Sequence, residues 1–286
     1  MRNDTPSTRR DFLKLAGAGA AAAAMCLDGR TTSLAEEASA TKHDRPLQLA
    51  LASYTLRKFD LDKTLQMTKR VGLPAICLKS FHLALDATPD EIAAAVAKAK
   101  KAGIVLYGGG VITMRNEKEI NQAFEYAKAA GMIRIMAAPT AEVLPIVDKK
   151  VQQYDIQVCI HNHGPGDKNF PTPDLIYEKI KGLDRRIGIC HDVGHTVRYG
   201  ADAIAMTEKY GDRMYDIHIK DVTAASAKGE CTACGRGVID LPKLLRTLVK
   251  AKFSGYLAFE YEVEANDPLP GLAESVGYIN GVMDTL

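Results

Sequence analysis

Hydrophobic positions along this chain form short apolar runs that alternate with longer segments in which apolar residues recur at helical spacing. Each apolar run has the length of a strand and is followed by one helical segment. The expected strands are 47–52, 75–79, 104–107, 133–137, 156–161, 187–192, 214–219 and 256–261. The expected helices are 61–71, 88–102, 117–130, 141–152, a segment from 173, 201–210, 241–252 and 272–283.

This strict alternation predicts parallel strands joined by right-handed helical crossovers. Eight such units match an α/β fold of the (β/α)8 TIM-barrel type, with a doubly wound open sheet as the second choice. The first strand is not followed by the glycine pattern of a dinucleotide-binding turn. Gly108, Gly109 and Gly110 are instead interpreted as a tight turn at the end of the third strand.

Five of the expected strands share a second pattern, because alternate side chains of a strand point to opposite faces. One face is mostly Ile, Leu, Val and Phe, which helices would cover. The other carries small residues early in the strand and ionisable residues at its end. These residues are Cys77 and Lys79; Gln157, Cys159, His161 and His163; Cys190 and Asp192; Asp216, His218 and Lys220; Ala258, Glu260 and Glu262. Since buried charges are costly unless paired or bound to metal, the pattern predicts one shared polar site.

Four of these residues form a plausible ligand set for one divalent metal ion: His161, Asp192, His218 and Glu260. Mixed imidazole and carboxylate ligands suit Mn, Zn, Fe or Co better than Ca, and Mg stays among the candidates. The alternative is a hydrogen-bonded polar network that holds no metal. His195 follows three residues after Asp192, and the alternative for this pair is a capping Asp and a surface His.

Composition limits the classes of function. The chain has 286 residues, of which 47% are hydrophobic, enough for a large core. Its net charge is +2, and the first 35 residues hold five Lys/Arg and three Asp/Glu, so the remainder is balanced at 32 of each sign. A neutral body argues against a nucleic-acid partner. After the N-terminus, no apolar run is long enough to span a membrane.

The N-terminus has the layout of a targeting segment. Arg9-Arg10-Asp11-Phe12-Leu13-Lys14 precedes an Ala- and Gly-rich run, which resembles a twin-arginine export signal. We therefore expect residues 1–35 to be a signal peptide, 36–45 a linker and 46–286 the barrel, exported folded to the periplasm. In that oxidising compartment Cys231 and Cys234 would form a local disulfide, with two free thiols as the alternative.

The strand-end motifs resemble those of the xylose-isomerase-like TIM-barrel superfamily, the sugar phosphate isomerases/epimerases, over about Leu47 to Leu286. The motifs are His161-Asn162-His163, Asp192-Val193-Gly194-His195, His218-Ile219-Lys220-Asp221, Gly235-Arg236-Gly237-Val238-Ile239-Asp240 and Phe259-Glu260-Tyr261-Glu262. The resemblance places the family's metal ligands on His161, Asp192, His218 and Glu260, and a substrate contact on His195. It also implies an enzyme that acts on a small carbohydrate.

One departure from the family pattern bears on the reaction. Family epimerases commonly hold Glu where this chain has His161, and their two metal-bound Glu residues exchange protons on opposite faces of the substrate. With one such base replaced, we expect a lyase or dehydratase acting on a keto-sugar or 3-keto-glycoside, as in the related inositol-ketone dehydratase and 3-keto-glycoside lyases. An isomerase or epimerase is the alternative, and a non-catalytic, exported carbohydrate-binding barrel is the competing class.

The expected chemistry is removal of a proton from carbon beside a metal-polarised carbonyl. Glu260, His163 and Lys220 are the candidate bases. The candidate substrate contacts are Lys79, His82, His195 and Arg236. Export favours an unphosphorylated sugar over a sugar phosphate. The choice of sugar, the choice of metal and the oligomeric state remain open.

Overall fold

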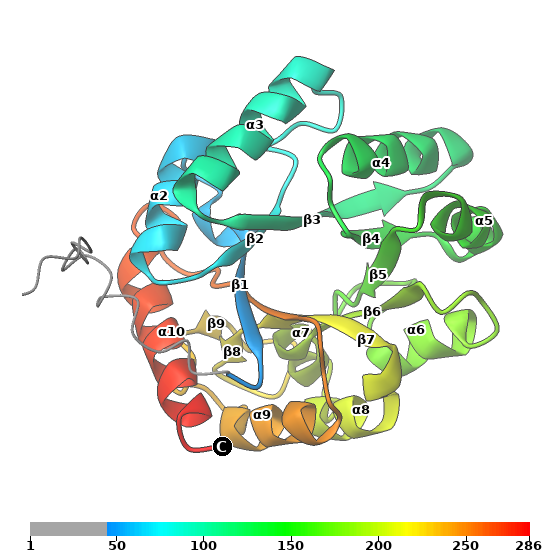
Figure 1. Ribbon diagram of the computed structural model, residues 1–286. Helices are drawn as coiled ribbons and strands as arrows, with labels where there is room; N and C mark the ends of the chain where they lie inside the picture. The colour runs from blue at the N-terminus through cyan, green and yellow to red at the C-terminus, as the bar shows by residue number, and fades with distance from the viewer. Residues whose placement is uncertain (1–44) are drawn as a thin grey trace, which may run out of the picture. The chain divides into compact units, whose positions relative to one another are not determined.

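The computed structural model describes residues 45–286, so the predicted signal peptide and most of the predicted linker lie outside the described residues. Within them, eight parallel strands close into a barrel in the order β1-β10-β7-β6-β5-β4-β3-β2. Figure 1 shows this ring of strands surrounded by helices. The TIM-barrel prediction is therefore confirmed, and the open-sheet alternative is wrong.

The elements follow the predicted alternation closely. The barrel strands are β1 (Gln48–Ala52), β2 (Ala75–Leu78), β3 (Val105–Met114), β4 (Arg134–Pro139), β5 (Gln157–His161), β6 (Ile187–Asp192), β7 (Met214–Ile219) and β10 (Tyr256–Phe259). The α-helices are α2 (Leu61–Arg70), α3 (Pro89–Ala102), α4 (Glu117–Ala129), α5 (Leu144–Tyr154), α6 (Pro173–Ile180), α7 (Val193–Arg198), α8 (Ala203–Tyr210), α9 (Leu241–Lys250) and α10 (Leu269–Met283). Short 3-10 turns are η1 (Ser53–Leu56), η2 (Ala141–Val143) and η3 (Gly211–Arg213).

Local sequence explains where the helices start and which face they bury. The hydroxyl of Thr88 accepts a hydrogen bond from the backbone N–H of Glu91, and the Glu91 carboxylate accepts one from the N–H of Thr88, so the two residues form a capping box at the start of α3. The leucines of α9 recur every three or four residues and are fully buried against the strands. They are Leu241, Leu244, Leu245 and Leu248.

The inside of the barrel is filled by small side chains, as the strand pattern predicts. Ala50, Ala52, Cys77, Cys159, Cys190 and Ala258 cluster there with the larger Tyr107 and Met136. The three cysteines are buried, and burial raises their thiol pKa values. They therefore act as small packing residues below the polar ends of the strands.

The three glycines of β3 are a correction to the predicted turn. They lie inside the strand, which continues to Met114. A Cβ on Gly110, whose φ is +142°, would lie 2.1 Å from the carbonyl oxygen of Met136 in β4. One on Gly108 would meet the end of the Met136 side chain at 2.6 Å. Glycine is needed because β4 packs closely against an irregular stretch of β3, where the register shifts between Gly109 and Ile112.

Two elements near the strand ends were not predicted. The short helix α7 begins directly after Asp192, and a two-stranded hairpin, β8 (Asp221–Val222) with β9 (Cys231–Thr232), follows β7.

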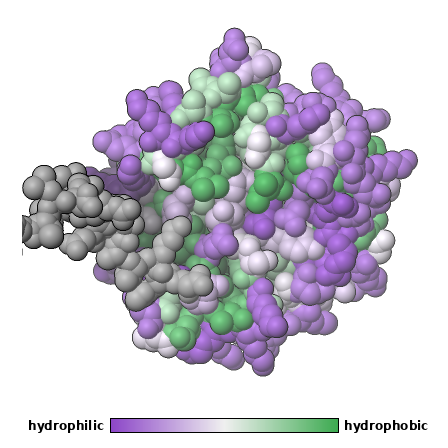
Figure 2. All heavy atoms as spheres, in the orientation of Figure 1, coloured by the Kyte–Doolittle hydropathy of each residue, from purple (hydrophilic) through white to green (hydrophobic). Residues whose placement is uncertain are grey.

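The face drawn in Figure 2 is mostly polar around its periphery, with apolar patches nearer its centre. Among the described residues, no helix combines the length and the apolar character that crossing a membrane requires.

Candidate metal centre and adjoining cavities

Four ionisable side chains converge at the ends of four neighbouring barrel strands. His161 ends β5, Asp192 ends β6, His218 lies in β7, and Glu260 directly follows β10. One ligand atom from each lies within 4.8 Å of all the others. Nε2 of His161 is 3.1 Å from Nδ1 of His218 and 3.4 Å from Oδ2 of Asp192, and Nδ1 of His218 is 3.3 Å from Oε2 of Glu260.

The protonation states of His161, Asp192 and Glu260 are those of metal ligands. Burial lowers the pKa of His161 well below its usual value, which keeps the imidazole neutral. Burial alone would raise the pKa of Asp192 and of Glu260, but the charge of Lys220 and the hydrogen bonds from His161 to Asp192 and from His218 to Glu260 hold both well below their usual range. Neutral imidazoles and ionised carboxylates are the forms that bind divalent cations.

The residues present fit a divalent metal ion. The atoms that face one another are Nε2 of His161, Nδ1 of His218, Oδ2 of Asp192 and Oε2 of Glu260. Two imidazoles and two carboxylates suit Zn, Mn, Fe or Co. The nearby Cys190 thiol also lies within reach of both imidazoles.

Lys220 is bound between the carboxylates. Its Nζ is 2.9 Å from Oδ2 of Asp192 and 2.9 Å from Oε2 of Glu260, and it also pairs with Glu262. Burial would lower the pKa of Lys220, but these carboxylates raise it well above its usual value. Lys220 is therefore a protonated ammonium in this arrangement, which counts against it as the proton-abstracting base.

The predicted motifs also hold residues that build the site without facing it. Asn162 bridges β5 and β6 by accepting from the backbone N–H of Asp192 and donating to the carbonyl of Asp192 and the hydroxyl of Thr196. Oδ1 of Asp192 accepts from the backbone N–H of His195 at 2.7 Å, so this candidate ligand also caps α7. Gly194 is required there because a Cβ would lie 2.4 Å from Cγ of Lys220.

Asp221 is a second buried organiser. Its carboxylate accepts four backbone hydrogen bonds, from Val222, Gly235, Gly237 and Ile239, at 2.9 to 3.2 Å. These bonds fold the Gly235–Asp240 motif back onto the residue after Lys220. The motif thus has a structural explanation.

A cavity of about 250 Å³ adjoins the four candidate ligands. It is lined by Tyr54, Lys79, Val111, His161, His163, His195, Glu260 and Glu262. Nζ of Lys79 is 3.4 Å from Oε1 of Glu260. Nδ1 of His163 is 3.3 Å from Oδ2 of Asp167, and the His163 side chain is 39% exposed. The structure therefore brings Lys79, His163 and His195 together with the four candidate ligands.

Two of the predicted substrate contacts are placed differently. His82 is buried, and its ring nitrogens are bonded to the hydroxyls of Ser53 and Thr64 and to the carbonyls of Leu56 and Phe59. It therefore has a structural role, linking η1 to the loop after β2. Arg236 is on the surface with a side chain that is 67% exposed, and it pairs with Glu274 of α10.

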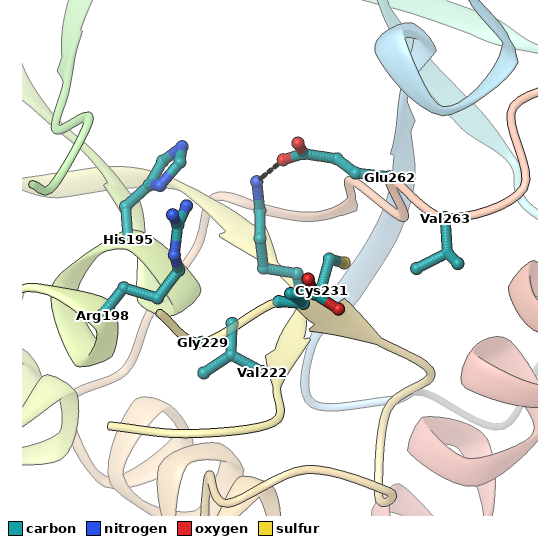
Figure 3. A pocket seen from close by; sticks show the side chains of 9 residues that line it. His195, Arg198, Val222, Gly229, Cys231, Glu262 and Val263 are labelled. Carbon is teal, nitrogen blue, oxygen red and sulfur yellow. Dashed lines mark hydrogen bonds and ion pairs between the residues drawn. The ribbon is translucent and has the colours of Figure 1, made fainter. Parts of the chain in front are cut away.

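A second cavity, of about 330 Å³, adjoins the first and shares His195 and Glu262 with it. Figure 3 shows His195 and Arg198 of α7 on one side of this cavity, and Glu262 and Val263 on the other, with Cys231 of the hairpin between them. Sequence reasoning missed Tyr54, Asp167 and Arg198. The spacing of Asp192, His195 and Arg198, every three residues, is the signal that would have placed them on one helical face.

The predicted disulfide is absent, since Cys231 and Cys234 are both free thiols in the structure. Cys231 lines the second cavity, whereas Cys234 is buried in the loop beside Ser275, whose hydroxyl accepts from its backbone N–H. Burial raises the pKa of Cys231 to about 11, so the free thiol is protonated at neutral pH.

Comparisons with known proteins agree with this architecture. The family model "Xylose isomerase-like TIM barrel" matches residues 47–281, and the model of the twin-arginine translocation signal sequence matches residues 6–25. The rhizopine catabolism protein MocC of Rhizobium meliloti is 28% identical over 147 residues, covering 46% of this chain and 45% of that protein. An inosose dehydratase of Bacillus velezensis is 25% identical over 143 residues, covering 44% of this chain and 45% of that protein.

These alignments thus span slightly less than half the length of either relative. Among solved structures, the IOLI protein with a zinc atom superposes with a TM-score of 0.70 and 16% identity, covering 84% of this chain and 99% of that one. At that level of identity the superposition establishes the fold alone.

Proposed function

Because the chain belongs to the xylose isomerase-like TIM barrel family, we propose that it is an exported, divalent-metal-dependent enzyme that eliminates an oxygen leaving group from a keto-sugar or 3-keto-glycoside. His161, Asp192, His218 and Glu260 would hold the metal. Zinc in the IOLI structure and the dehydratase name of a relative support this class of chemistry. A metal ion bound there would supply a Lewis acid that polarises a carbonyl and lowers the pKa of the C–H group on the adjacent carbon.

The observation that carries the proposal is which ionisable groups of the first cavity are held in ion pairs and which is free to take a proton. Both carboxylates on its β10 side are bound by lysines: Glu260 by Lys79 and Lys220, and Glu262 by Lys220. On the β5 side, His163 is half-exposed and is oriented by Asp167. One oriented base on one side of the cavity suits an elimination, whereas reversible epimerisation needs on each face of the substrate a group that can both take up and return a proton.

His163 has the geometry of a proton-transfer group. Asp167 accepts backbone hydrogen bonds from Asn169 and Phe170, which fix its carboxylate opposite the His163 ring. His163 takes the proton from the carbon beside the carbonyl, and the C–H electron pair becomes a C=C bond. The C–O bond on the next carbon breaks, and the imidazolium returns its proton to the departing oxygen. The base is regenerated, and no oxidant or reductant is consumed.

The direct test is to incubate the metal-loaded protein with a panel of 3-keto-glycosides and keto-inositols in D2O. We expect an unsaturated ketone, detected by ultraviolet absorbance and NMR, and release of the aglycone or water. His163→Gln should abolish the product while the protein still binds metal, and Asp167→Asn should lower kcat more than it changes KM. If the panel gives only inverted or isomerised, deuterated sugars, the protein is an epimerase or isomerase. Ligand binding without turnover would favour the non-catalytic class.

Export favours substrates without phosphate, which agrees with this choice of panel. The twin-arginine signal match at residues 6–25 supports a protein that folds before it leaves the cytoplasm. A metal ion could then be acquired before export. A keto-sugar released from extracellular glycans or glycosides is the kind of substrate that such an enzyme would meet.

A further inference from the structure

The side chain of Arg198 places a positive charge in the second cavity, and the proposed reaction does not use it. Nε of Arg198 is buried and has no hydrogen-bond partner, and its only hydrogen bond within residues 45–286 runs from Nη2 to the carbonyl of Ala227 at 3.4 Å. No ion pair to Arg198 is formed within that part of the chain. A guanidinium that lines a cavity in this way has unsatisfied donors.

The other charges around this cavity do not neutralise Arg198. Glu262 pairs with Lys220, and Lys220 is shared with Asp192 and Glu260. Glu230 also lines the cavity but is exposed and forms no ion pair. Nδ1 of His195, on the same helix as Arg198, is likewise buried without a hydrogen-bond partner. The α7 side of the cavity therefore offers an unpaired guanidinium beside an imidazole.

The hairpin loop that borders the cavity is held in a fixed shape. The hairpin loop is closed by hydrogen bonds from the N–H of Thr223 to the carbonyl of Glu230 at 2.9 Å, and from the N–H of Glu230 to the Thr223 hydroxyl at 3.0 Å. A Cβ on Gly229 would lie 2.2 Å from the carbonyl oxygen of Ala224, so the turn is compact. Arg198 thus faces a formed cavity, and the planar guanidinium suits bidentate binding of a carboxylate.

We propose that this second cavity is an anion subsite in which Arg198 binds a carboxylate group of the substrate, while the sugar ring occupies the adjoining metal cavity. Shared lining by His195 and Glu262 makes the two cavities one continuous recognition surface. The proposed function contributes only the assumption that a carbohydrate occupies the first cavity. The substrate class becomes a carboxylated keto-sugar, such as a uronic acid derivative or a glycoside with an acidic aglycone.

The test compares D-glucuronate with its neutral isostere D-glucuronamide, titrated by calorimetry into the metal-loaded full chain. We expect glucuronate to bind at least about 10-fold more tightly, the effect of one charge-assisted contact of about 1.4 kcal/mol. Arg198→Gln should remove the difference, and Arg198→Lys should keep part of it. Glu230→Gln should strengthen glucuronate binding by removing a like charge. Arg185→Gln, which changes a surface arginine paired with Asp212, is the matched control and should change nothing.

Equal affinities, no measurable glucuronate binding, or a preference that survives in Arg198→Gln would each overturn the subsite. Tighter binding of D-glucose 6-phosphate than of glucuronate would overturn the choice of carboxylate. The readout needs no turnover, so it separates the two proposals. A protein that prefers glucuronate but eliminates nothing keeps the subsite and loses the proposed function. A protein that eliminates from neutral keto-sugars but shows no preference for glucuronate keeps the proposed function and loses the subsite.

Discussion

Asn162 and Asp192 are joined by two hydrogen bonds that run in opposite directions. Oδ1 of Asn162 accepts from the backbone N–H of Asp192 at 2.9 Å, and Nδ2 of Asn162 donates to the carbonyl oxygen of Asp192 at 3.1 Å. Both residues are fully buried. The amide therefore ties the end of β6 to the end of β5 and fixes where the Asp192 carboxylate leaves the strand.

We predict that Asn162→Ala weakens metal binding by about 10- to 100-fold, the usual effect of losing a group that orients a ligand. The reason is that the backbone of Asp192 loses both bonds to the neighbouring strand. Competition with a chromophoric chelator measures the affinity. Gln153→Ala, which removes an exposed amide on α5, should have no effect. Unchanged affinity in Asn162→Ala would show that Asp192 is not oriented by this pair.

A second prediction separates the two roles of Asp192. Its side chain is a candidate ligand and also caps α7 through the N–H of His195. Asp192→Asn keeps a capping oxygen but removes the charge, so it should lose the bound metal while α7 stays folded. Asp192→Ala should lose both, at a further cost of about 1 kcal/mol in the free energy of unfolding.

Metal analysis and urea unfolding of the two variants make the comparison. Asp202→Asn is the control, because Asp202 caps α8 in the same way. Full metal occupancy in Asp192→Asn would rule Asp192 out as a ligand.

The fold and the four candidate ligands could be predicted from the sequence because both depend on the regular spacing of apolar and polar residues. Apolar runs of strand length predicted the barrel, and alternate positions in four strands placed His161, Asp192, His218 and Glu260 at one end. What it missed depends on contacts that cross elements. The four carbonyl and hydroxyl partners of His82 lie between residues 53 and 64, from η1 to the first turn of α2, and no spacing in the sequence reveals them.

The same limit explains Arg236 and the glycines of β3. Arg236 follows the pattern of a loop cation near the site, yet its partner Glu274 is on the last helix, 38 residues later. Gly108 to Gly110 are typical of a turn, but the close approach of Met136 from β4 determines their place in a strand. Predicting either case requires knowing how close two elements lie in space, and the periodic pattern of the sequence does not give that distance.

A third prediction concerns export. Replacing Arg9 and Arg10 together by Lys should leave the chain in the cytoplasm of a host with twin-arginine transport, because the motif that the signal match rests on is lost. Cell fractionation followed by immunoblotting measures the distribution. Arg30→Lys, a change of the same kind outside residues 6–25, is the control and should leave export unchanged. Equal export of the two variants would mean that the signal has been misinterpreted.

A fourth prediction compares Asp221 with Asp240, the last residue of the glycine motif. Asp221→Ala leaves four backbone N–H groups without their acceptor, two of them buried and two part-buried, so it should lower the free energy of unfolding by more than about 3 kcal/mol. Asp240→Ala removes only the cap of α9 and should cost about 1 kcal/mol. Urea unfolding of the metal-free proteins gives both values. Equal losses would mean that Asp221 does not organise the loop.

The last prediction concerns pH and rests on His82. Burial lowers the pKa of His82 below 6.5, although two backbone carbonyls and Asp60 oppose the shift, so the ring is neutral in the folded chain. The unfolded chain binds a proton there near pH 6.5, and the folded chain does so only at lower pH. The stability contributed by His82 is therefore complete above pH 6.5 and is lost as the pH falls below it.

His82→Gln cannot titrate and loses part of the hydrogen bonding, so at pH 8 it should be less stable than the unchanged chain by on the order of 2 kcal/mol. Between pH 6.5 and 5 that difference should shrink, because only the unchanged chain loses stability through His82. Urea unfolding in chelator across this range measures the difference. The other buried histidines affect both proteins equally and cancel. A difference that stays constant with pH would show that His82 carries no linked proton, and one that grows on acidification would reverse the sign.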